Sequence, residues 1–243
     1  NVLRINSSHG DIDGHREVIK NSRFVDENLD VKTAILLDLQ GPKLRVGDID
    51  GGEMMLEDNS EIKIVVGNEA GRNGKIFTNY AHFAIDVKQG EPVLLDDGKI
   101  RLEVLSSDNK LEVICKVIHG GILKPRKGLN LPKTEISLPC ITEKDKVDLD
   151  FALDENVDWI GLSFVRNSLD IEQLKSMIKR RDKHARVVAK IEKPEAVADI
   201  DQIITASDAI MIARGDLAID IGHSEVPKIQ LSLIKKCSQF SKS

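Results

Sequence analysis

Residues 187–216 read VVAKIEKPEAVADIDQIITASDAIMIARGD and contain a complete strand–helix–strand unit. The two ends, 187–192 and 209–213, are short apolar runs, and the segment between them begins with Pro194 and continues at helical spacing to about Ala206. A proline in the first turn is typical of a helix start, because the nitrogen that it blocks has no partner inside the helix. Strands that alternate with helices predict a parallel sheet.

Apolar runs of the same kind lie earlier in the chain, at 2–6, 34–38 and 159–164. Their nearly continuous hydrophobicity is typical of parallel strands that are covered on both faces. Helical patterns lie between them. Ile171 and Ile178 belong to one apolar stripe, Thr142 with Asp145 resembles a capping box in which Asp replaces the usual Glu, and a last helix is expected over 226–240. The predicted parallel sheet therefore has five strands.

Residues 43–138 show a different pattern, in which short strands are separated by turns. The expected strands are 62–66, 93–95, 100–104 and 111–117. Residue groups that favour tight turns occur at Asp50-Gly51-Gly52, Asp97-Gly98 and Gly120-Gly121. We therefore expect an all-β domain at 43–138, inserted between the second and third parallel strands of a domain formed by 1–42 and 139–243.

The length of the chain limits what the parallel part can form. A complete (β/α)8 barrel needs about 250 residues, and removing the inserted domain from the 243 residues leaves only about 150. That is enough for about five strand–helix units, which agrees with the predicted strands. The expected fold is α/β, an incomplete (β/α)8 or TIM barrel with an inserted all-β barrel as a lid. An open five-stranded sheet is the alternative.

Composition excludes several classes of protein. Hydrophobic residues make up 41% of the chain, enough for a sizeable core, so a disordered chain is excluded. The net charge is -5 with both signs mixed and no strongly basic block, which argues against a nucleic-acid partner. No apolar run approaches the roughly 18 residues of a membrane span. The widely spaced Cys115, Cys140 and Cys237 suit a reducing compartment such as the cytoplasm better than a disulfide framework.

Polar residues lie at or near the C-terminal end of each predicted barrel strand. In chain order they are Arg4, Asn6 and Ser8, then Asp38, then Ser163 and Arg166, then Lys190 and Glu192, and finally Arg214, Gly215 and Asp216. The carboxyl ends of the strands form one face of a βα barrel, and active sites lie on that face. The convergence of these groups predicts an active site.

Lys190-Ile191-Glu192 is the most informative short motif. Residues two apart on a strand point to the same side, so we expect Lys190 and Glu192 to project into the barrel and Ile191 to project outward. Charged side chains in that position need a partner or a metal ion. A structural ion pair at the rim is the alternative to a functional site.

Further groups suit the binding of a metal ion and a phosphate. Glu192 and Asp216 supply the hard oxygen ligands that Mg²⁺ and Mn²⁺ prefer. Gly215 allows a sharp turn and the close approach of a ligand to the backbone. Arg4 can hold a phosphate through two hydrogen bonds. Ordinary capping of the next helix and of the strand end are the alternatives.

Residues 38–45, DLQGPKLR, join the second strand to the inserted domain. Gly41-Pro42 predicts a stiff hinge, and Arg45 is placed to reach phosphates from the lid. A linker with solvated charges is the alternative, and Asp97 and Lys127 would count as surface charges without further context.

In order and spacing, a set of motifs resembles those of the pyruvate kinase family over essentially the whole chain. The motifs are LRINSSHG at 3–10, LDLQGPK at 37–43, DDG at 96–98, KGLNLP at 127–132, LP at 138–139 with EKD at 143–145, SFVR at 163–166, KIE at 190–192 and MIARGDL at 211–217. The resemblance implies a barrel with an inserted lid that transfers a phosphoryl group from phosphoenolpyruvate to ADP. The products would be pyruvate and ATP, in the last step of glycolysis.

The resemblance also implies a role for each matching residue. Arg4 and Lys190 would be catalytic residues that bind the phosphoryl group, and Lys190 would also stabilise the enolate. Gly215 and Asp216 would bind the substrate, and Glu192 and Asp216 would hold Mg²⁺ or Mn²⁺. The residues around the nucleotide would be Asn6, His9, Arg45, Lys127 and Asp97.

The chain departs from the family pattern where a monovalent cation binds. Potassium-dependent members have Thr and Glu at the positions of Leu39 and Lys43, so the chain resembles the potassium-independent branch. We expect the ammonium group of Lys43 to replace the cation, so that K⁺ is not required. The residues of this region would be Asn6, Ser8, Asp38 and Leu39. A solvated lysine is the alternative.

Members of the family contain a barrel strand before the position of residue 1, and further strands and a C-terminal domain after that of residue 243. We therefore expect little kinase activity from the chain alone, and a cytoplasmic homotetramer for a full-length parent. Two other interpretations stay open: a metal-dependent lyase or aldolase of pyruvate-like acids, and a non-catalytic module that retains the fold.

Overall fold

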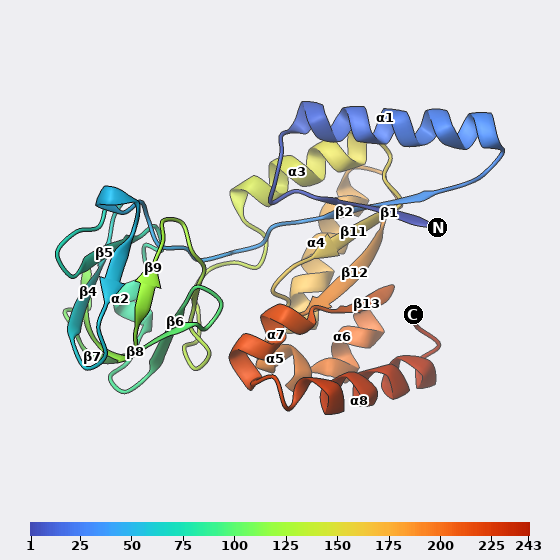
Figure 1. The fold of residues 1–243 in the computed structure, drawn as a ribbon. Coiled ribbons are helices and arrows are strands. Elements are labelled where there is room, and N and C mark those ends of the chain that lie inside the picture. The colour runs from blue at the N-terminus through green and yellow to red at the C-terminus, as the bar shows by residue number, and fades with distance from the viewer. The chain divides into compact units, whose positions relative to one another are not determined.

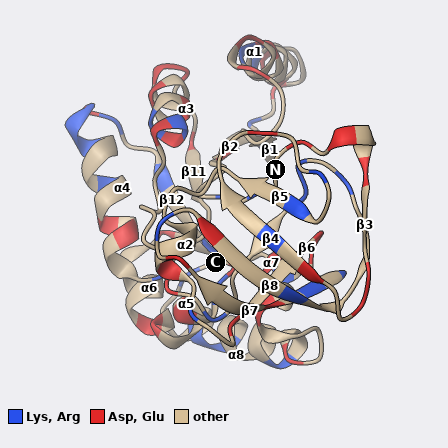
Figure 2. Ribbon diagram, turned by 90° about the vertical axis from the view of Figure 1, so that its left-hand side faces the viewer, with Lys and Arg blue, Asp and Glu red and all other residues tan.

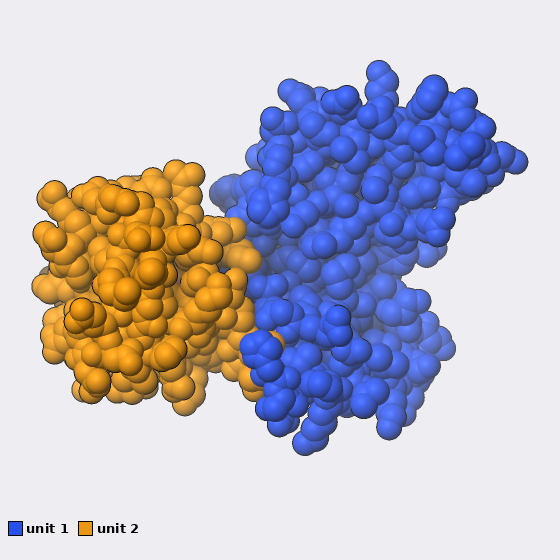
Figure 3. All heavy atoms as spheres, viewed as in Figure 1, with its two compact units in different colours: residues 1–42, 139–217, 223–243 blue, residues 43–138, 218–222 orange.

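The computed structural model describes residues 1–243 as two compact units, each with its own hydrophobic core (Figures 1 and 3). Unit 1 comprises Asn1–Pro42, Pro139–Leu217 and His223–Ser243. Unit 2 comprises Lys43–Leu138 and the short segment Ala218–Gly222. That segment groups with unit 2, although the sequence analysis assigned it to the barrel.

Unit 1 is built on a five-stranded parallel sheet. The strand order is β1 (Val2–Asn6), β2 (Ala34–Asp38), β11 (Trp159–Leu162), β12 (Arg186–Ile191) and β13 (Ala209–Ile212). Each strand lies beside the one that precedes it in unit 1, as successive strand–helix units of a barrel require. The α/β prediction of an incomplete (β/α)8 barrel with an inserted β domain is confirmed.

One or more helices follow each strand of the parallel sheet (Figure 1). They are α1 (Ile12–Leu29), α3 (Glu143–Asp154), α4 (Ser168–Arg180), α5 (Pro194–Ala198), α6 (Ile200–Ala206), α7 (Arg214–Ile221), whose last turn belongs to the segment grouped with unit 2, and α8 (Val226–Gln239). The capping box is present, because Thr142 accepts from the backbone of Asp145 and the Asp145 side chain accepts in return. The single helix expected over 194–206 is wrong: it divides at Asp199, whose carboxylate accepts a hydrogen bond from the backbone of Ser168 instead.

The two faces of the parallel sheet differ in what they contact. Alternate strand residues such as Ile35, Leu37 and Ile191 belong to the main core, together with apolar residues of the helices. Residues between them, such as Leu36 and Val188, form a small separate cluster on the other face. Because side chains alternate along a strand, the polar residues that continue the second set share its face.

Unit 2 contains a six-stranded sheet in the order β10-β6-β7-β8-β4-β5 and the separate pair β3-β9. The strands are β3 (Met54–Leu56), β4 (Glu61–Val66), β5 (Lys75–Thr78), β6 (Pro92–Leu95), β7 (Ile100–Ser107), β8 (Glu112–His119), β9 (Gly121–Leu123) and β10 (Leu129–Asn130). The sequence analysis missed the short strands β3, β5, β9 and β10. The domain also includes the single-turn helix α2 (Phe83–Asp86) and a 3-10 turn at Asp50–Gly52.

Charged residues of both signs are interspersed along the chain, as Figure 2 shows. None of the helices combines the length and the apolar character that a bilayer span requires.

Candidate active site

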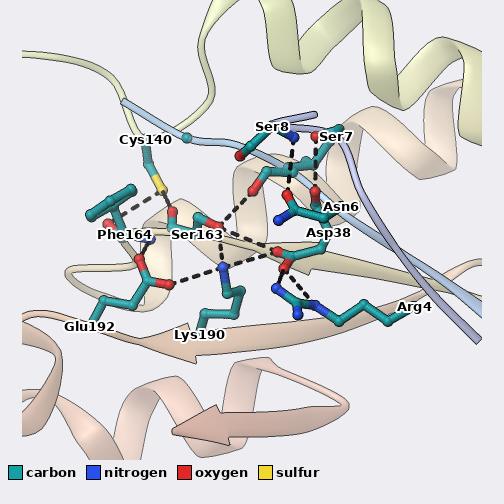
Figure 4. Close-up of polar contacts among 12 residues, drawn as sticks. Arg4, Asn6, Ser7, Ser8, Asp38, Cys140, Ser163, Phe164, Lys190 and Glu192 are labelled. Carbon is teal, nitrogen blue, oxygen red and sulfur yellow. Dashed lines mark hydrogen bonds and ion pairs between the residues drawn. The ribbon is translucent and has the colours of Figure 1, made fainter. Parts of the chain in front are cut away.

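The candidate site lies at the C-terminal ends of the parallel strands of unit 1 (Figure 4). Arg4 comes from β1, Asp38 ends β2, Ser163 follows β11, and Lys190 and Glu192 lie at and just beyond the end of β12. Parallel register brings these ends together: Asn6 pairs with Asp38, and Asp38 pairs with Gly161. Side chains far apart in sequence therefore form one network.

Asp38 lies at the centre of this network. Its carboxylate is buried, with a side-chain exposure of 1%. Arg4 donates to Oδ2 from Nε over 2.8 Å and also from Nη2, while Nζ of Lys190 lies 3.0 Å from Oδ1. The sequence analysis placed Asp38 among the converging polar strand ends and in the monovalent-cation region, and the structure joins it to both predicted catalytic residues.

Lys190 has three acceptors within hydrogen-bond distance of its ammonium group. Nζ lies 2.6 Å from Oγ of Ser163, 2.9 Å from Oε1 of Glu192 and 3.0 Å from Oδ1 of Asp38. Burial lowers the pKa of Lys190, but the negative charges of Glu192 and Asp38 outweigh burial and raise the pKa above its usual 10.5. Lys190 therefore stays charged at neutral pH.

Glu192 is 2% exposed, and the two oxygens of its carboxylate have different partners. Oε1 pairs with Lys190, and Oε2 accepts a hydrogen bond of 3.0 Å from the backbone of Phe164. Burial raises the pKa of Glu192, Lys190 opposes that rise, and the negative charge of Asp216 adds to it. Asp216 is therefore close enough to repel the carboxylate of Glu192.

This donor set fits a divalent cation. Two carboxylates that repel each other are stabilised by a metal ion between them, and oxygen ligands of this kind suit Mg²⁺ or Mn²⁺. No group of three or more His, Cys, Asp or Glu side chains is arranged to hold a metal. A metal at Glu192 and Asp216 would therefore complete its coordination with water and substrate oxygens.

Gly215 lies in the first turn of α7, with Asp216 beside it. The expected sharp turn at Gly215 is wrong, since the chain enters a helix directly and Gly215 has no positive φ. A Cβ added there would meet no atom within 4 Å. The first amides of a helix have no partner inside it, so an anionic group can approach this open position.

The other predicted residues of unit 1 lie around the end of β1. Oδ1 of Asn6 accepts a 3.0 Å hydrogen bond from the backbone of Ser8, and His9 is exposed. Leu39 is 1% exposed and packs in the core, so only its backbone offers an oxygen, which accepts a 2.6 Å hydrogen bond from Ser163. Lys43, the predicted internal cation, is half-buried at the start of unit 2.

The predicted nucleotide residues of unit 2 lie together around β10 and the end of β6. Arg45 forms a bridge with Gly128 and donates to the carbonyl of Arg126 over 3.0 Å. Lys127 lies 2.9 Å from Asp96, a residue that the sequence analysis did not select. Asp97 is exposed in the adjacent turn, where a Cβ on Gly128 would lie 3.5 Å from its carboxylate.

Ser163, one of the polar residues predicted to converge at the strand ends, accepts a hydrogen bond from Lys190 through its hydroxyl. The sequence analysis assigned no role at the site to Phe164 or Cys140. Phe164 has a φ of 54°, a left-handed conformation that no sequence pattern at this position indicates. The thiol of Cys140 lies 3.2 Å from the carbonyl oxygen of Ser163.

Comparison with known proteins gives consistent matches. The family model "Pyruvate kinase, barrel domain" matches residues 1–243. The pyruvate kinase of Geobacillus stearothermophilus is 41% identical over 244 residues, which cover 100% of this chain and 42% of that protein. The pyruvate kinase of Corynebacterium glutamicum is 40% identical over 241 residues, covering 99% of this chain and 50% of that protein.

A solved structure agrees with these matches. The crystal structure of a pyruvate kinase from Cryptosporidium parvum superposes with a TM-score of 0.93 at 33% identity, covering 100% of this chain and 51% of that one. The chain thus spans about half the length, or less, of the relatives that it matches.

Proposed function

This chain belongs to the pyruvate kinase family, and from that premise we propose that it provides most of a catalytic barrel and its lid for phosphoryl transfer from phosphoenolpyruvate to ADP, a phosphotransferase reaction. The products are pyruvate and ATP. The lyase or aldolase alternative is not favoured, because the relatives at about 40% identity are pyruvate kinases.

One observation supports the proposal most strongly. Arg4, Asp38, Lys190 and Glu192 form a continuous chain of ion pairs of alternating sign at the carboxyl ends of the barrel strands. Phosphoryl transfer depends mainly on positioning and on stabilising negative charge. Two cations held rigidly on one buried carboxylate meet both requirements.

Arg4 and Gly215 bind the two ends of phosphoenolpyruvate in this proposal. Nε and Nη2 of Arg4 are engaged by Asp38, so Nη1 is left to hold an oxygen of the phosphoryl group. The side chain of Arg4 is 50% exposed, which allows a ligand to reach it. The backbone at Gly215 binds the substrate carboxylate at the start of α7.

Lys190 stabilises the negative charge of the transferring phosphoryl group and of the enolate that remains. Its three neighbours already use the three N–H groups of the ammonium. A substrate oxygen must therefore replace one of those acceptors when it binds, and the charge on Lys190 is kept because at least one carboxylate remains next to it.

Glu192 and Asp216 hold the divalent metal ion, Mg²⁺ or Mn²⁺. Bound there, the metal neutralises negative charge on substrate oxygens. Asp216 also lies next to Gly215 and so links the metal position to the substrate carboxylate. The raised pKa of Glu192 implies that metal affinity falls at acidic pH, since the carboxylate must lose its proton to bind the ion.

Unit 2 acts as the lid, with the domain boundaries at residues 42/43 and 138/139. Arg45 and Lys127, which bring positive charge, and Asp97, which brings a carboxylate, have nucleotide-binding roles in this proposal, as do Asn6 and His9 of unit 1. Their gathering around β10 supports a shared role. A lid would exclude water, which competes with ADP as the phosphoryl acceptor.

Lys43 supplies the positive charge that K⁺ provides in potassium-dependent members. The apolar Leu39, which offers no side-chain oxygen to a cation, supports this assignment. A strict K⁺ requirement in a full-length family member that carries Leu39 and Lys43 would contradict it. The matched measurement replaces KCl with tetramethylammonium chloride at constant ionic strength.

A cytoplasmic location and a homotetrameric full-length enzyme complete the proposal. All three cysteines are free and buried, which agrees with a reducing compartment. Light scattering of the full-length protein tests the tetramer.

The deciding experiment is a lactate dehydrogenase-coupled assay on a full-length family member that carries these site residues. Lys190→Met should reduce kcat at least about 100-fold, the scale expected when a charge-stabilising donor is lost. Lys175→Met is the control, because Lys175 pairs with Asp208 in the same unit and away from the network. Pyruvate formation that does not depend on ADP, or full activity in Lys190→Met, would refute the proposal.

A further inference from the structure

The two segments through which the chain leaves and re-enters unit 1 contact the same turn, Ser163–Phe164. Figure 4 shows the contact of Cys140, on the returning segment, with this turn. The chain leaves after Gly41-Pro42 and returns at Pro139-Cys140. The turn follows β11 and lies directly beside Lys190 and Glu192.

Gly41 packs against the turn more closely than any other residue type can. A Cβ on Gly41 would lie 2.8 Å from the Phe164 ring and 3.0 Å from Cβ of Ser163. Gly41 also has a φ of 68°, which favours glycine. Its backbone donates a 3.0 Å hydrogen bond to the buried carboxylate of Asp145, so the segment is fixed from two sides.

Cys140 binds the same turn from the returning segment. It is 1% exposed, and its sulfur lies 3.2 Å from the carbonyl oxygen of Ser163 and 3.6 Å from that of Phe164. Burial raises the pKa of Cys140 well above its usual value, so the group remains a thiol with a proton to donate. The single S–H is shared between the two carbonyl groups.

The Ser163–Phe164 turn contacts Lys190 and Glu192, the side chains proposed for catalysis and metal binding. Phe164, at a φ of 54°, donates its backbone N–H to Oε2 of Glu192 over 3.0 Å. Oγ of Ser163 accepts from Lys190 over 2.6 Å. A bulky residue keeps a left-handed conformation only where its surroundings fix it, and here Gly41 and Cys140 are those surroundings.

We propose that the Ser163–Phe164 turn is a positioning element that couples both connecting segments to the carboxylate of Glu192. The coupling rests on the proposed function, in which Glu192 holds the metal. Moving either segment rotates the turn, redirects the N–H of Phe164 and changes how Glu192 presents its oxygens. Neither Gly41 nor Cys140 is a proposed metal ligand, and both contact the turn that includes Phe164, so both act through Phe164.

The first test measures binding of Mn²⁺ alone to the chain, by the loss of the free-ion electron paramagnetic resonance signal. Gly41→Ala should weaken binding about fivefold or more, the effect of losing one hydrogen bond. Gly51→Ala is the matched control, since Gly51 has a φ of 76° and a Cβ there meets nothing within 4 Å. It imposes a similar backbone cost in unit 2 and should leave Mn²⁺ affinity unchanged.

Cys140 supplies a second and milder test. Cys140→Ala should weaken Mn²⁺ binding about threefold to fivefold, and Cys140→Ser should restore it, because a hydroxyl donates to the same carbonyl groups. Cys237→Ala in α8 controls for the loss of a buried thiol in the same unit. Circular dichroism melts establish that each variant is folded, and if Gly41→Ala does not fold, the Cys140 series decides.

The outcomes separate this inference from the proposed function. Unchanged Mn²⁺ affinity in folded Gly41→Ala or in Cys140→Ala overturns the coupling and leaves the metal site intact. Failure of the parent chain to bind Mn²⁺ counts against the metal site itself. If Cys140→Ala and Cys140→Ser lower the melting temperature and the Mn²⁺ affinity alike, the hydrogen bond of Cys140 is not needed. Cys140 then only packs, which also overturns the coupling.

Discussion

Asp38→Asn tests whether one buried carboxylate organises the site. The substitution keeps the size of the side chain and removes the charge that Arg4 and Lys190 share. At 3.0 Å and an effective dielectric constant of about 20, the attraction between Asp38 and Lys190 is roughly 5 kcal/mol. The half-exposed Arg4 is compensated by water, so its pair adds little.

The net loss of stability in Asp38→Asn is smaller than this attraction, because folding of the variant no longer has to remove a charged carboxylate from water. Lys190 also keeps Glu192 and Ser163 as partners. We expect the free energy of unfolding to fall by about 3 kcal/mol, the lower end of the range for breaking a buried pair.

Urea denaturation followed by circular dichroism measures this loss as a lower transition midpoint at unchanged slope. Asp154→Asn is the control: Asp154 pairs with Arg181 at 2.7 Å, but its side chain is 66% exposed, so little stability should be lost. If Asp38→Asn costs no more than this control, Asp38 does not organise the network and the argument for a preorganised pair of cations fails.

Three further predictions concern the surroundings of the site. Gly161→Ala places a Cβ 3.2 Å from Oδ1 of Asp38, and should lower the free energy of unfolding by about 1–2 kcal/mol in urea denaturation; no loss would mean that Asp38 moves freely. Thr142→Ala removes one half of the capping box of α3 and should lower the free energy of unfolding by about 1 kcal/mol in the same assay. Thr142→Ser keeps the hydroxyl and should retain most of that stability. The ammonium of Lys127 beside Asp96 holds the pKa of that carboxyl below 3.8, so its stabilisation is present above pH 3.8 and is lost as the pH falls through the lowered value. Asp96→Asn should therefore flatten the acid side of the stability–pH curve, and an unchanged slope would contradict this assignment.

Periodicity predicted the parts of the site that lie on a single strand. The same-side projection of Lys190 and Glu192 follows from the repeat of two along β12, and Ile191 is buried in the core as that repeat requires. The capping box at Thr142 was equally local, since all of its atoms lie within four residues.

Contacts between strands could not be predicted in this way. That Asp38 joins Arg4 to Lys190 depends on the register of β1 against β2 and on the packing of β12 nearby, which no short motif encodes. The left-handed Phe164 and the close approach of Gly41 are likewise results of tertiary packing. The sequence shows a glycine at position 41, but it does not show that Phe164 packs against that position and excludes a larger residue.

The negative charges of Glu192 and Asp216 predict the order in which a cation and an anion bind. Asp216 repels the carboxylate of Glu192, and Lys190 beside them is already paired with Asp38 and Glu192. An anionic group that approaches these two carboxylates alone is therefore repelled, whereas a divalent ion held by Glu192 and Asp216 would neutralise them and favour an anionic substrate. If the proposed metal site is right, phosphoenolpyruvate should bind far more tightly in the presence of Mn²⁺ than in its absence, and equal affinity under both conditions would contradict the site.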